Sequence, residues 1–445
     1  MGTETYAWRR TGRHRTDLQQ DTEPDHSARE RNRHALTTLR HRNFRLIWCG
    51  QLVSTIGGQM QQVAIAWHLY NLTGSSFQVG LVAFFGIAPF LFLSLVGGAL
   101  ADQFDRKRIL LVTQTATMLV SSLLVIATVA HVITPTMIFA ISFLSGMTRA
   151  FDAPARQSMI PNLVPPNELA NALTLNTMLR QLGTIAGPGL GGLILGFFGV
   201  GVTYALNTIS FLGIISALLI MDPLPPIKRV TQPGWQLALG GFRFVKSEPV
   251  VLSLLMLDFV ANIFGALRSL FPAFAADVLD VGPQELGLLY SAPAAGAVTG
   301  ALLLGWMGSR TRHPALILAI VAAFGLFTAG FGFSRTLPMA LVMLFGTGLA
   351  DVIGEVIRST IVQLRTPDEL RGRVTSLTVV FTGGGPQVGQ LQAGALASAL
   401  GPAEAAIIGG GAVLASALAF CLNPHMRRLP AAPDLAAQTV AANSS

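Results

Sequence analysis

Six ionisable side chains lie inside apolar stretches of the sequence, where an isolated charge is costly. A charge at the middle of a bilayer costs about 2.5–3.5 kcal/mol even on insertion scales, so such residues normally face protein or a water-filled cavity. At this depth a carboxylate can pair with an arginine, or it can bind and release a proton when its surroundings change. The six residues are Arg149, Asp152, Arg180, Asp258, Asp351 and Glu355.

Two interpretations of these charges stay open from the sequence. In the first, they form salt bridges that hold an inner gate closed. In the second, one carboxylate carries a proton during a transport cycle. Asp258 is preferred for that role because no cation lies within one helical turn of it, and Asp351 comes second, with Glu355 and Arg358 on the same helix face. Arg268, near the outer end of its span, is expected to snorkel toward the membrane surface.

The elements that must carry these residues are membrane spans. The chain is 51% hydrophobic and only 12% charged, about half the charged fraction of a soluble domain. Repeated apolar runs of about 18 residues or more predict an all-α membrane protein with twelve transmembrane helices. The predicted spans are 44–70, 78–101, 108–131, 134–153, 169–198, 200–221, 249–275, 284–308, 313–333, 336–358, 371–398 and 402–423.

Basic residues fix the expected orientation and the domain limits. They gather in one set of loops, while the opposite loops hold only Arg335. Basic loops stay in the cytoplasm, so both termini are predicted to be cytoplasmic. The prediction divides the chain into a disordered basic tail (1–42), an N-terminal six-helix bundle (43–221), a linker with a helix in the membrane surface (222–248), a C-terminal six-helix bundle (249–423) and a second tail (424–445).

The fifth span carries a glycine stripe. Gly183, Gly187 and Gly191 recur every four residues, so they share a helix face on which another helix can pack closely. Pro188 removes a backbone hydrogen bond and predicts a bend, and Gly192 extends the motif.

The two halves of the chain repeat each other. The sequence Pro-x-Glu-Leu precedes both the fifth and the eleventh span, at 166–169 and 367–370. Gly187-Pro188 is matched by Gly385-Pro386 in the second half. Two repeats with a bent helix at corresponding positions predict alternating access to a site between them.

The loop after span two is a further motif. It contains Gly98, Asp102, Arg106 and Lys107 at a spacing that resembles the signature loop of the major facilitator superfamily. Asp105 stands where that signature usually has glycine. In the second half Trp306 replaces the aspartate, so only the first half carries the full element.

Other stretches narrow the resemblance. The glycine-proline motif of span five is similar to one associated with drug–proton antiporters of this superfamily, and Arg149 with Asp152 partly resembles their fourth-helix arginine motif. The stretches 43–48, 67–75 and 151–155 are similar to the branch that contains enterobactin exporters and macrolide efflux proteins. The resemblance covers residues 40 to 425.

This resemblance implies two pseudo-symmetric six-helix bundles and export of an amphipathic small molecule, such as a siderophore or macrolide, by proton antiport across a bacterial inner membrane. The expected partners are substrate, protons and lipid, with the protein a monomer. The net charge of +8 sits in loops and tails, so no nucleic acid is expected. The sequence has no phosphate-binding loop, metal-ligand spacing or catalytic pair, so we expect no enzyme, cofactor or metal.

The first helix of each three-helix unit tends to line the cavity in this superfamily. In span one Gln51, Thr55 and Gln62 form a polar stripe with Gly58, and this stripe is expected to meet substrate. Further lining was expected from Asn262, Phe84, Phe85, Phe259 and Phe264.

Two alternatives to export remain at this point. An uptake permease has the same fold, and the span-five motif argues against it only by resemblance. A membrane receptor that no longer transports belongs to a different class, and the intramembrane charges and the doubled bent helix disfavour it.

Overall fold

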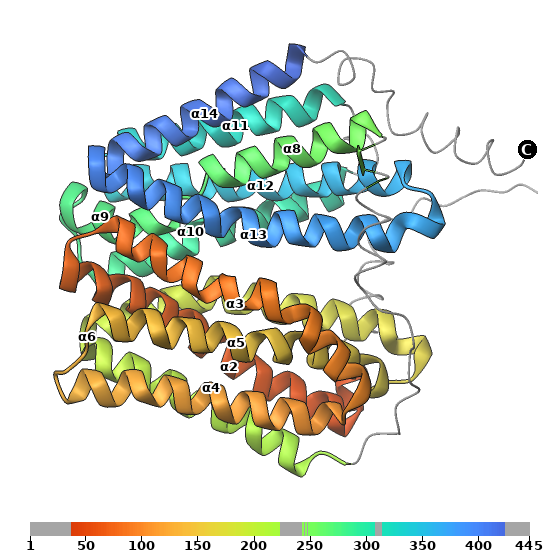
Figure 1. Cartoon of the computed structure of the whole chain (residues 1–445). Helices are drawn as coiled ribbons and strands as arrows, with labels where there is room; N and C mark the ends of the chain where they lie inside the picture. Colours follow the sequence, from red (N-terminus) through yellow and green to blue (C-terminus); the bar gives the residue numbers. More distant parts are fainter. Residues whose placement is uncertain (1–36, 223–242, 244, 247, 308–313, 423–445) are drawn as a thin grey trace, which may run out of the picture.

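The computed structural model of the chain describes residues 37–222, 243, 245–246, 248–307 and 314–422, and its secondary structure within these ranges is helical. Figure 1 shows two bundles, one above the other, with α2 to α6 in the lower and α8 to α14 in the upper. The second expected tail lies outside the described residues from 424 on, as do residues 1–36 of the first tail and most of the expected surface helix in the linker. Residues 37–42, which the prediction had placed in a disordered tail, contain the 3₁₀ helix η1 (Thr38–Arg40) and the first residue of α2.

The N-terminal bundle contains six spans in five continuous helical segments. The last segment holds spans five and six, which meet at Gly199, whose φ of 80° is readily adopted only by glycine. Pro188 lies inside the helical part of this segment, and the non-helical residue is Gly199. The segments are α2 (Arg42–Thr73), α3 (Ser76–Gln103), α4 (Arg106–Val129), α5 (Pro135–Met159) and α6 (Leu169–Ile220).

The C-terminal bundle supplies the other six spans. Five of them are single helices, and the seventh span is made of α8 and the short helices that follow it. The elements are α8 (Pro249–Phe264), η4 (Arg268–Leu270), α9 (Phe271–Ala273), the π-helix η5 (Phe274–Val278), α10 (Pro283–Met307), α11 (Pro314–Phe333), α12 (Leu337–Arg365), α13 (Asp368–Leu400) and α14 (Pro402–Leu422).

The predicted span over 249–275 is present, as part of an apolar segment from Pro249 to Val278, but it is not one continuous helix. The helix ends at Gly265, whose N–H still bonds to the Ala261 carbonyl at 2.8 Å. Glycine weakens a helix and Pro272, further on, cannot donate a backbone hydrogen bond, so the chain continues in short 3₁₀ and π turns. Burial of Phe271 and Phe274 holds this irregular stretch in place.

Two polar side chains fix the turn between α3 and α4. The Asp105 carboxylate accepts from the Lys107 N–H at 2.9 Å and is the N-cap of α4. This explains why an aspartate can stand where the superfamily signature usually has glycine. The Lys107 ammonium donates to the Met221 carbonyl at 2.7 Å, and thereby caps the end of α6.

The glycine stripe of span five packs within its own bundle. A Cβ added at Gly183 would lie 2.5 Å from the Thr55 side chain of α2, and one added at Gly191 would lie 2.8 Å from the Met60 Cα. In the second half a Cβ at Gly389 would lie 2.5 Å from the Ile263 carbonyl oxygen. Span eleven therefore packs on span seven as span five packs on span one, which agrees with the sequence repeat.

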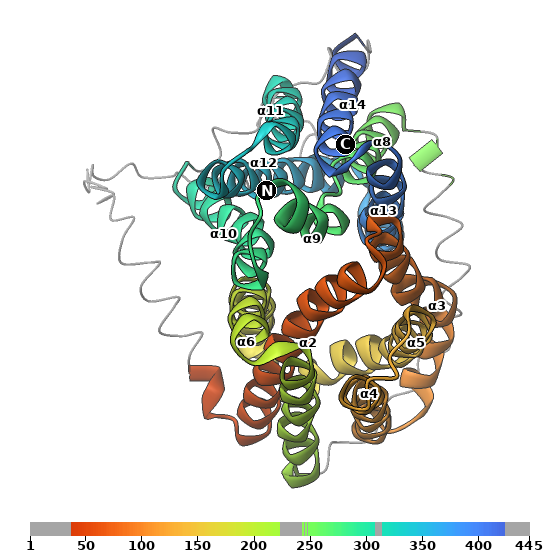
Figure 2. The ribbon, with the colours of Figure 1, turned by 90° about the vertical axis from the view of Figure 1, so that its left-hand side faces the viewer.

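The two bundles meet along two seams, α6 against α10 and α3 against α13 (Figure 2). In the first seam a Cβ at Gly192 would lie 2.6 Å from the Gly287 Cα. In the second a Cβ at Gly80 would lie 2.4 Å from the Gln390 carbonyl oxygen. Both seams thus bring backbone against backbone. They lie toward the end of the molecule that carries Gly74, which we call the Gly74 end; the opposite end, where α2 begins, is the Arg42 end.

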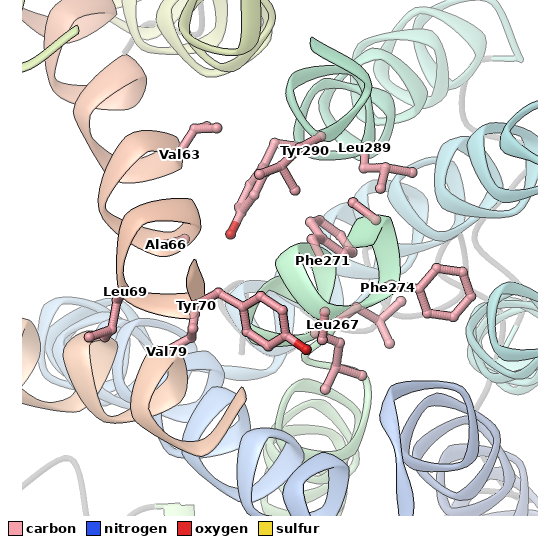
Figure 3. Close-up of a cluster of buried hydrophobic side chains, with 14 of the residues drawn as sticks. Val63, Ala66, Leu69, Tyr70, Val79, Leu267, Phe271, Phe274, Leu289 and Tyr290 are labelled. Atoms are coloured by element: carbon pink, nitrogen blue, oxygen red, sulfur yellow. The ribbon is translucent and has the colours of Figure 1, made fainter. Parts of the chain in front are cut away.

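Side chains also join the bundles at the Gly74 end. The Tyr70 hydroxyl of α2 donates to the Asp277 carboxylate of η5, and the Phe77 N–H donates to the Ser398 hydroxyl at 3.0 Å. Apolar side chains of α2 face those of η4, α9 and α10 beside these bonds (Figure 3). The Gly74 end is therefore closed in this conformation.

We expect Gly192→Ala to open the Gly74 end. The added methyl group would meet the backbone of α10 well inside the ordinary carbon–carbon separation of about 3.5–4.0 Å. The measurement is the distance between spin labels at Leu72 and Leu400, which are exposed at this end, after serine replaces Cys49 and Cys421. We expect a longer-distance population in the variant.

The matched control is Gly201→Ala, on the same helical segment, where the nearest atom to an added Cβ is the Val129 side chain at an ordinary 3.7 Å. This change should leave the distance distribution as in the unaltered protein. Identical distributions for Gly192→Ala and Gly201→Ala would contradict the role of the α6–α10 seam.

Candidate functional site

A cavity of about 850 Å³ lies between the bundles. Most of its wall comes from α2, α5 and α6, and the C-terminal bundle contributes Arg268, Tyr290, Gln387 and Gln390. The wall follows α5 from Ile141 to the end of that helix, so the cavity extends toward the Arg42 end. Its volume is in the range that holds a drug-sized molecule, about 300–1,000 Å³.

Three of the helices that line the cavity, unlike α6, are less apolar than a typical membrane span. Eight helical segments of the described chain are long and apolar enough to cross a membrane by length and composition. α2, α5 and α13 fall outside this set. Their polar residues face the cavity instead of lipid, and this explains why their mean hydropathy is lower.

The structure places the polar stripe of span one in the cavity wall. Gln51, Thr55, Gly58 and Gln62 all line it, and the amide of Gln51 donates to the Thr55 hydroxyl at 3.1 Å. Gln387 and Gln390 face the same space from α13. Sequence reasoning missed this second pair, although their spacing of three residues puts them on one helix face.

Asn262 lies outside the cavity wall. Its amide donates to the Asp258 carbonyl at 2.9 Å, one turn back along α8, and its Cβ lies against Gly385 of α13. The lining also does not include the phenylalanines that the sequence had suggested, and its aromatic members are Phe211 and Tyr290.

Among the residues that the structure describes, four arginines line the cavity, and Asp152 is the one carboxylate in its wall. Asp152 is an ion-pair partner of Arg156, one helical turn further along α5. It also accepts from the Gln114 amide at 2.6 Å and from the Thr113 hydroxyl at 3.2 Å. Arg156 lies beyond position 153, the predicted end of span four, and the prediction therefore places it in a loop. α5 in fact continues to Met159, six residues further, so Arg156 lies on the helix.

The other three arginines have no ion pair within the described part of the chain. Arg180 donates to the Thr177 hydroxyl at 3.2 Å. Arg149 interacts electrostatically with Asp152 but does not form an ion pair with it. Arg268 does not snorkel to the membrane surface, as the sequence had suggested, but lines the cavity. The break in span seven after Gly265 places it there.

The C-terminal bundle contains a cluster of acidic residues outside the cavity wall. The Asp258 carboxylate pairs with the Arg358 guanidinium at 2.5 Å, and both residues are buried. Asp351 and Glu355, on α12, lie within electrostatic reach of this pair. The argument that set Asp258 apart therefore fails, since the cation that its own span lacks comes from α12. None of these four residues is part of the cavity wall.

Every ion pair among the described residues joins two groups of the same bundle. At the Arg42 end they include Arg42 with Asp222 at 2.8 Å and Arg365 with Glu248 at 3.2 Å, and Glu168 is paired with Arg40 and His41. In this conformation the described charges therefore form no bridge that would close the Arg42 end.

The signature loop contributes helix packing at the Arg42 end. A Cβ at Gly97 would lie 2.2 Å from the Ala150 carbonyl oxygen of α5, whereas one at Gly98 would meet nothing within 4 Å. Gly97 is thus the residue that permits close contact between α3 and α5. Arg106 is half-buried at the start of α4, and the side chain of Asp102 lies outside the described part of the structure.

Comparison with known proteins agrees with this architecture. The chain is 27% identical over 399 residues to the enterobactin exporter EntS of Citrobacter koseri, and the match covers 88% of this chain and 95% of that protein. It is 28% identical over 395 residues to the enterobactin exporter EntS of Shigella boydii serotype 18, with 88% and 94% covered.

Two solved structures share the fold. The nucleoside transporter NupG has a TM-score of 0.68 and 16% identity, with 87% of this chain and 100% of that chain covered. A bacterial homologue of the human lysosomal transporter Spinster, in an inward-facing and unoccupied conformation, has a TM-score of 0.64 and 17% identity, with 85% and 94% covered. At these identities the likeness concerns the fold alone.

A family model described as "Transmembrane secretion effector" matches residues 33–442, nearly the whole chain. The twelve spans in two bundles and the central cavity are what a transporter of a small molecule across a lipid bilayer requires. The chain belongs to the transmembrane secretion effector family, within the major facilitator superfamily of membrane transporters.

Proposed function

We propose that this protein exports an amphipathic small molecule from the bacterial cytoplasm in exchange for protons. The observation that carries the proposal is the cavity of about 850 Å³, which is closed at the Gly74 end and lined by arginines and amides. The similarity to enterobactin exporters supports the direction of transport. The basic loops at the Arg42 end support a cytoplasmic position for that end and for both termini in the inner membrane.

In this proposal the structure is the state that receives substrate from the cytoplasm. The two seams at the Gly74 end separate in the next state, while the bundles approach each other at the Arg42 end. Backbone contacts between glycine faces suit such rocking, because few side chains have to interdigitate or change rotamer. Alternating access in transporters built from repeats works largely by such rigid-body motion.

The acidic cluster of the C-terminal bundle is the proposed proton site. Asp258, Asp351 and Glu355 lie around Arg358, and Asp351 also interacts electrostatically with Arg268, so three acids face two arginines. Asp351 is half-buried, stands at the midpoint of α12, and has no ion-pair or hydrogen-bond partner within the described ranges. A proton on Asp351 removes an uncompensated charge from the membrane interior, where such a charge is expensive.

The packing of α12 connects the proton site to the α6–α10 seam. A Cβ at Gly348, one turn before Asp351, would lie 1.8 Å from the Pro293 carbonyl oxygen of α10. A Cβ at Gly296 of α10 would lie 1.9 Å from the Phe345 carbonyl oxygen of α12. These backbones touch, so a shift of α12 on protonation moves α10, which also forms the seam with α6.

We expect Asp351→Asn to abolish proton-driven export while leaving the protein in the membrane. The amide keeps the size of the side chain but cannot exchange a proton. Metabolite profiling of cells with and without the gene first identifies a compound that is retained in its absence. Uptake of that compound by energised inverted vesicles then measures transport, which should fall at least about tenfold, the effect of roughly 1.4 kcal/mol.

Asp280→Asn is the matched control. Asp280 lies in the loop between η5 and α10 at the Gly74 end with a φ of 52°, a conformation that asparagine also tolerates. Normal uncoupler-sensitive uptake by Asp351→Asn would remove this residue from the mechanism.

Asp258→Asn should also stop transport, for a different reason. The change leaves the buried Arg358 guanidinium without the carboxylate that it contacts at 2.5 Å, and breaking a buried pair in this way costs about 3–5 kcal/mol. We therefore expect a lower unfolding temperature in detergent together with lost transport, whereas Asp351→Asn should lose transport alone. Full stability and full transport in Asp258→Asn would show that the pair is dispensable.

The same profiling distinguishes export from the two alternatives. An uptake permease predicts depletion of a compound in cells that lack the protein, and a receptor predicts no change in either direction. Accumulation inside the cells is the result expected for an exporter.

A further inference from the structure

We propose that the cavity binds an anionic substrate, an amphipathic molecule with at least one negatively charged oxygen group such as a carboxylate or sulfonate. This inference rests on the proposed export function and names the chemical class of its substrate. It is based on the charged groups in the cavity wall and on the partners of each of these groups.

The cavity wall is strongly positive. It contains Arg149, Arg156, Arg180 and Arg268 against the single carboxylate of Asp152. Asp152 is already engaged by Arg156, Gln114 and Thr113, so its charge and its lone pairs are used within the N-terminal bundle. Three guanidinium groups remain for a bound molecule.

The acids of the C-terminal bundle do not neutralise these arginines. Asp258 is paired with Arg358, and Glu355 is within electrostatic reach of the same arginine. Asp351 is the only acid of this cluster that interacts electrostatically with Arg268. Asp351 itself lies outside the cavity wall. Arg149 and Arg180, which come from α5 and α6, therefore have no acidic partner across the cavity among the described residues.

An unpaired guanidinium in the interior of a membrane protein needs water or an anion near it. The planar fork of arginine donates two parallel hydrogen bonds to a carboxylate or a similar group, and such charge-assisted bonds are stronger than neutral ones. A bound anion would satisfy Arg149 and Arg180 in this way. A cationic molecule would instead meet three like charges and no free carboxylate.

The remaining wall explains why the substrate should also be amphipathic. Gln62 and Gln390 present amides from opposite bundles, and these can donate to or accept from further polar groups. Ile65, Val82 and Leu179 add apolar surface to the same space. A molecule with an anionic group, several polar atoms and an apolar body matches all three kinds of lining.

The test is the stabilisation of the purified full-length protein by matched probes that differ in charge. Naphthalene-1-acetate and indole-3-acetate are compared with their neutral amides and with the cationic 2-(1-naphthyl)ethylamine. We expect the acids to raise the unfolding temperature at about tenfold or more lower concentration than the amides, as one charge-assisted hydrogen bond implies. The amine should have no effect.

Variants locate the preference in the cavity. Arg149→Gln and Arg180→Gln should each reduce the advantage of acid over amide, while Arg149→Lys and Arg180→Lys should retain part of it because the charge remains. Arg335→Gln is the matched control, since Arg335 lies in the loop between α11 and α12 at the Gly74 end and donates only to nearby carbonyls. Equal half-saturation for acid and amide, stronger stabilisation by the amine, or an unchanged preference in both glutamine variants would overturn the proposal.

If no probe stabilises the protein, the compound that is retained by cells lacking the protein decides whether the substrate is anionic. An anion at neutral pH supports the proposal. A neutral or cationic compound shows that the substrate class is wrong while export stands. Retention of no compound at all refutes the export function and, with it, this inference.

Discussion

The structure depends on how a membrane protein accommodates charge in its interior, where every ionised group needs water or a partner. The two bundles meet this requirement in different ways. In the C-terminal bundle Asp258 and Arg358 pair directly and are buried. In the N-terminal bundle Arg149 and Arg180 face an open cavity. Asp258, Asp351 and Glu355 thus lie outside the cavity wall, where Asp152 is the one carboxylate among the described residues and is paired with Arg156. In the proposed mechanism the proton site and the substrate site are therefore different places in the molecule.

In the proposed mechanism these two places communicate through helix packing. α10 touches α12 on one side and α6 on the other, each time with glycines that bring the backbones together. In that mechanism a change of charge on α12 acts on the α6–α10 seam through these backbone contacts. The α3–α13 seam has the same construction, and the two together close the Gly74 end. The symmetry of the repeat explains why both seams lie at the same end.

The sequence predicts most of the fold because apolar run length and repeated motifs report directly on spans and symmetry. It predicts the site less well, since ion-pair partners depend on how helices are rotated and how far they extend. Asp258 and Arg358 are a hundred residues apart, and no local pattern connects them. Arg156 and Arg268 were misplaced for local reasons, a longer α5 and a broken span seven. The stripe of Gln51, Thr55 and Gln62 was placed correctly on one face because helical periodicity alone determines it.

The closest contacts in the seams are between main chains, and this has an evolutionary consequence. Main-chain contact requires glycines at a few positions, whereas in the proposed function the substrate is recognised by the side chains of the cavity wall. Mutations in the cavity wall can therefore alter the preferred substrate without disturbing the two seams that close the Gly74 end. Related proteins can therefore differ in substrate while they share the same helix packing at the seams.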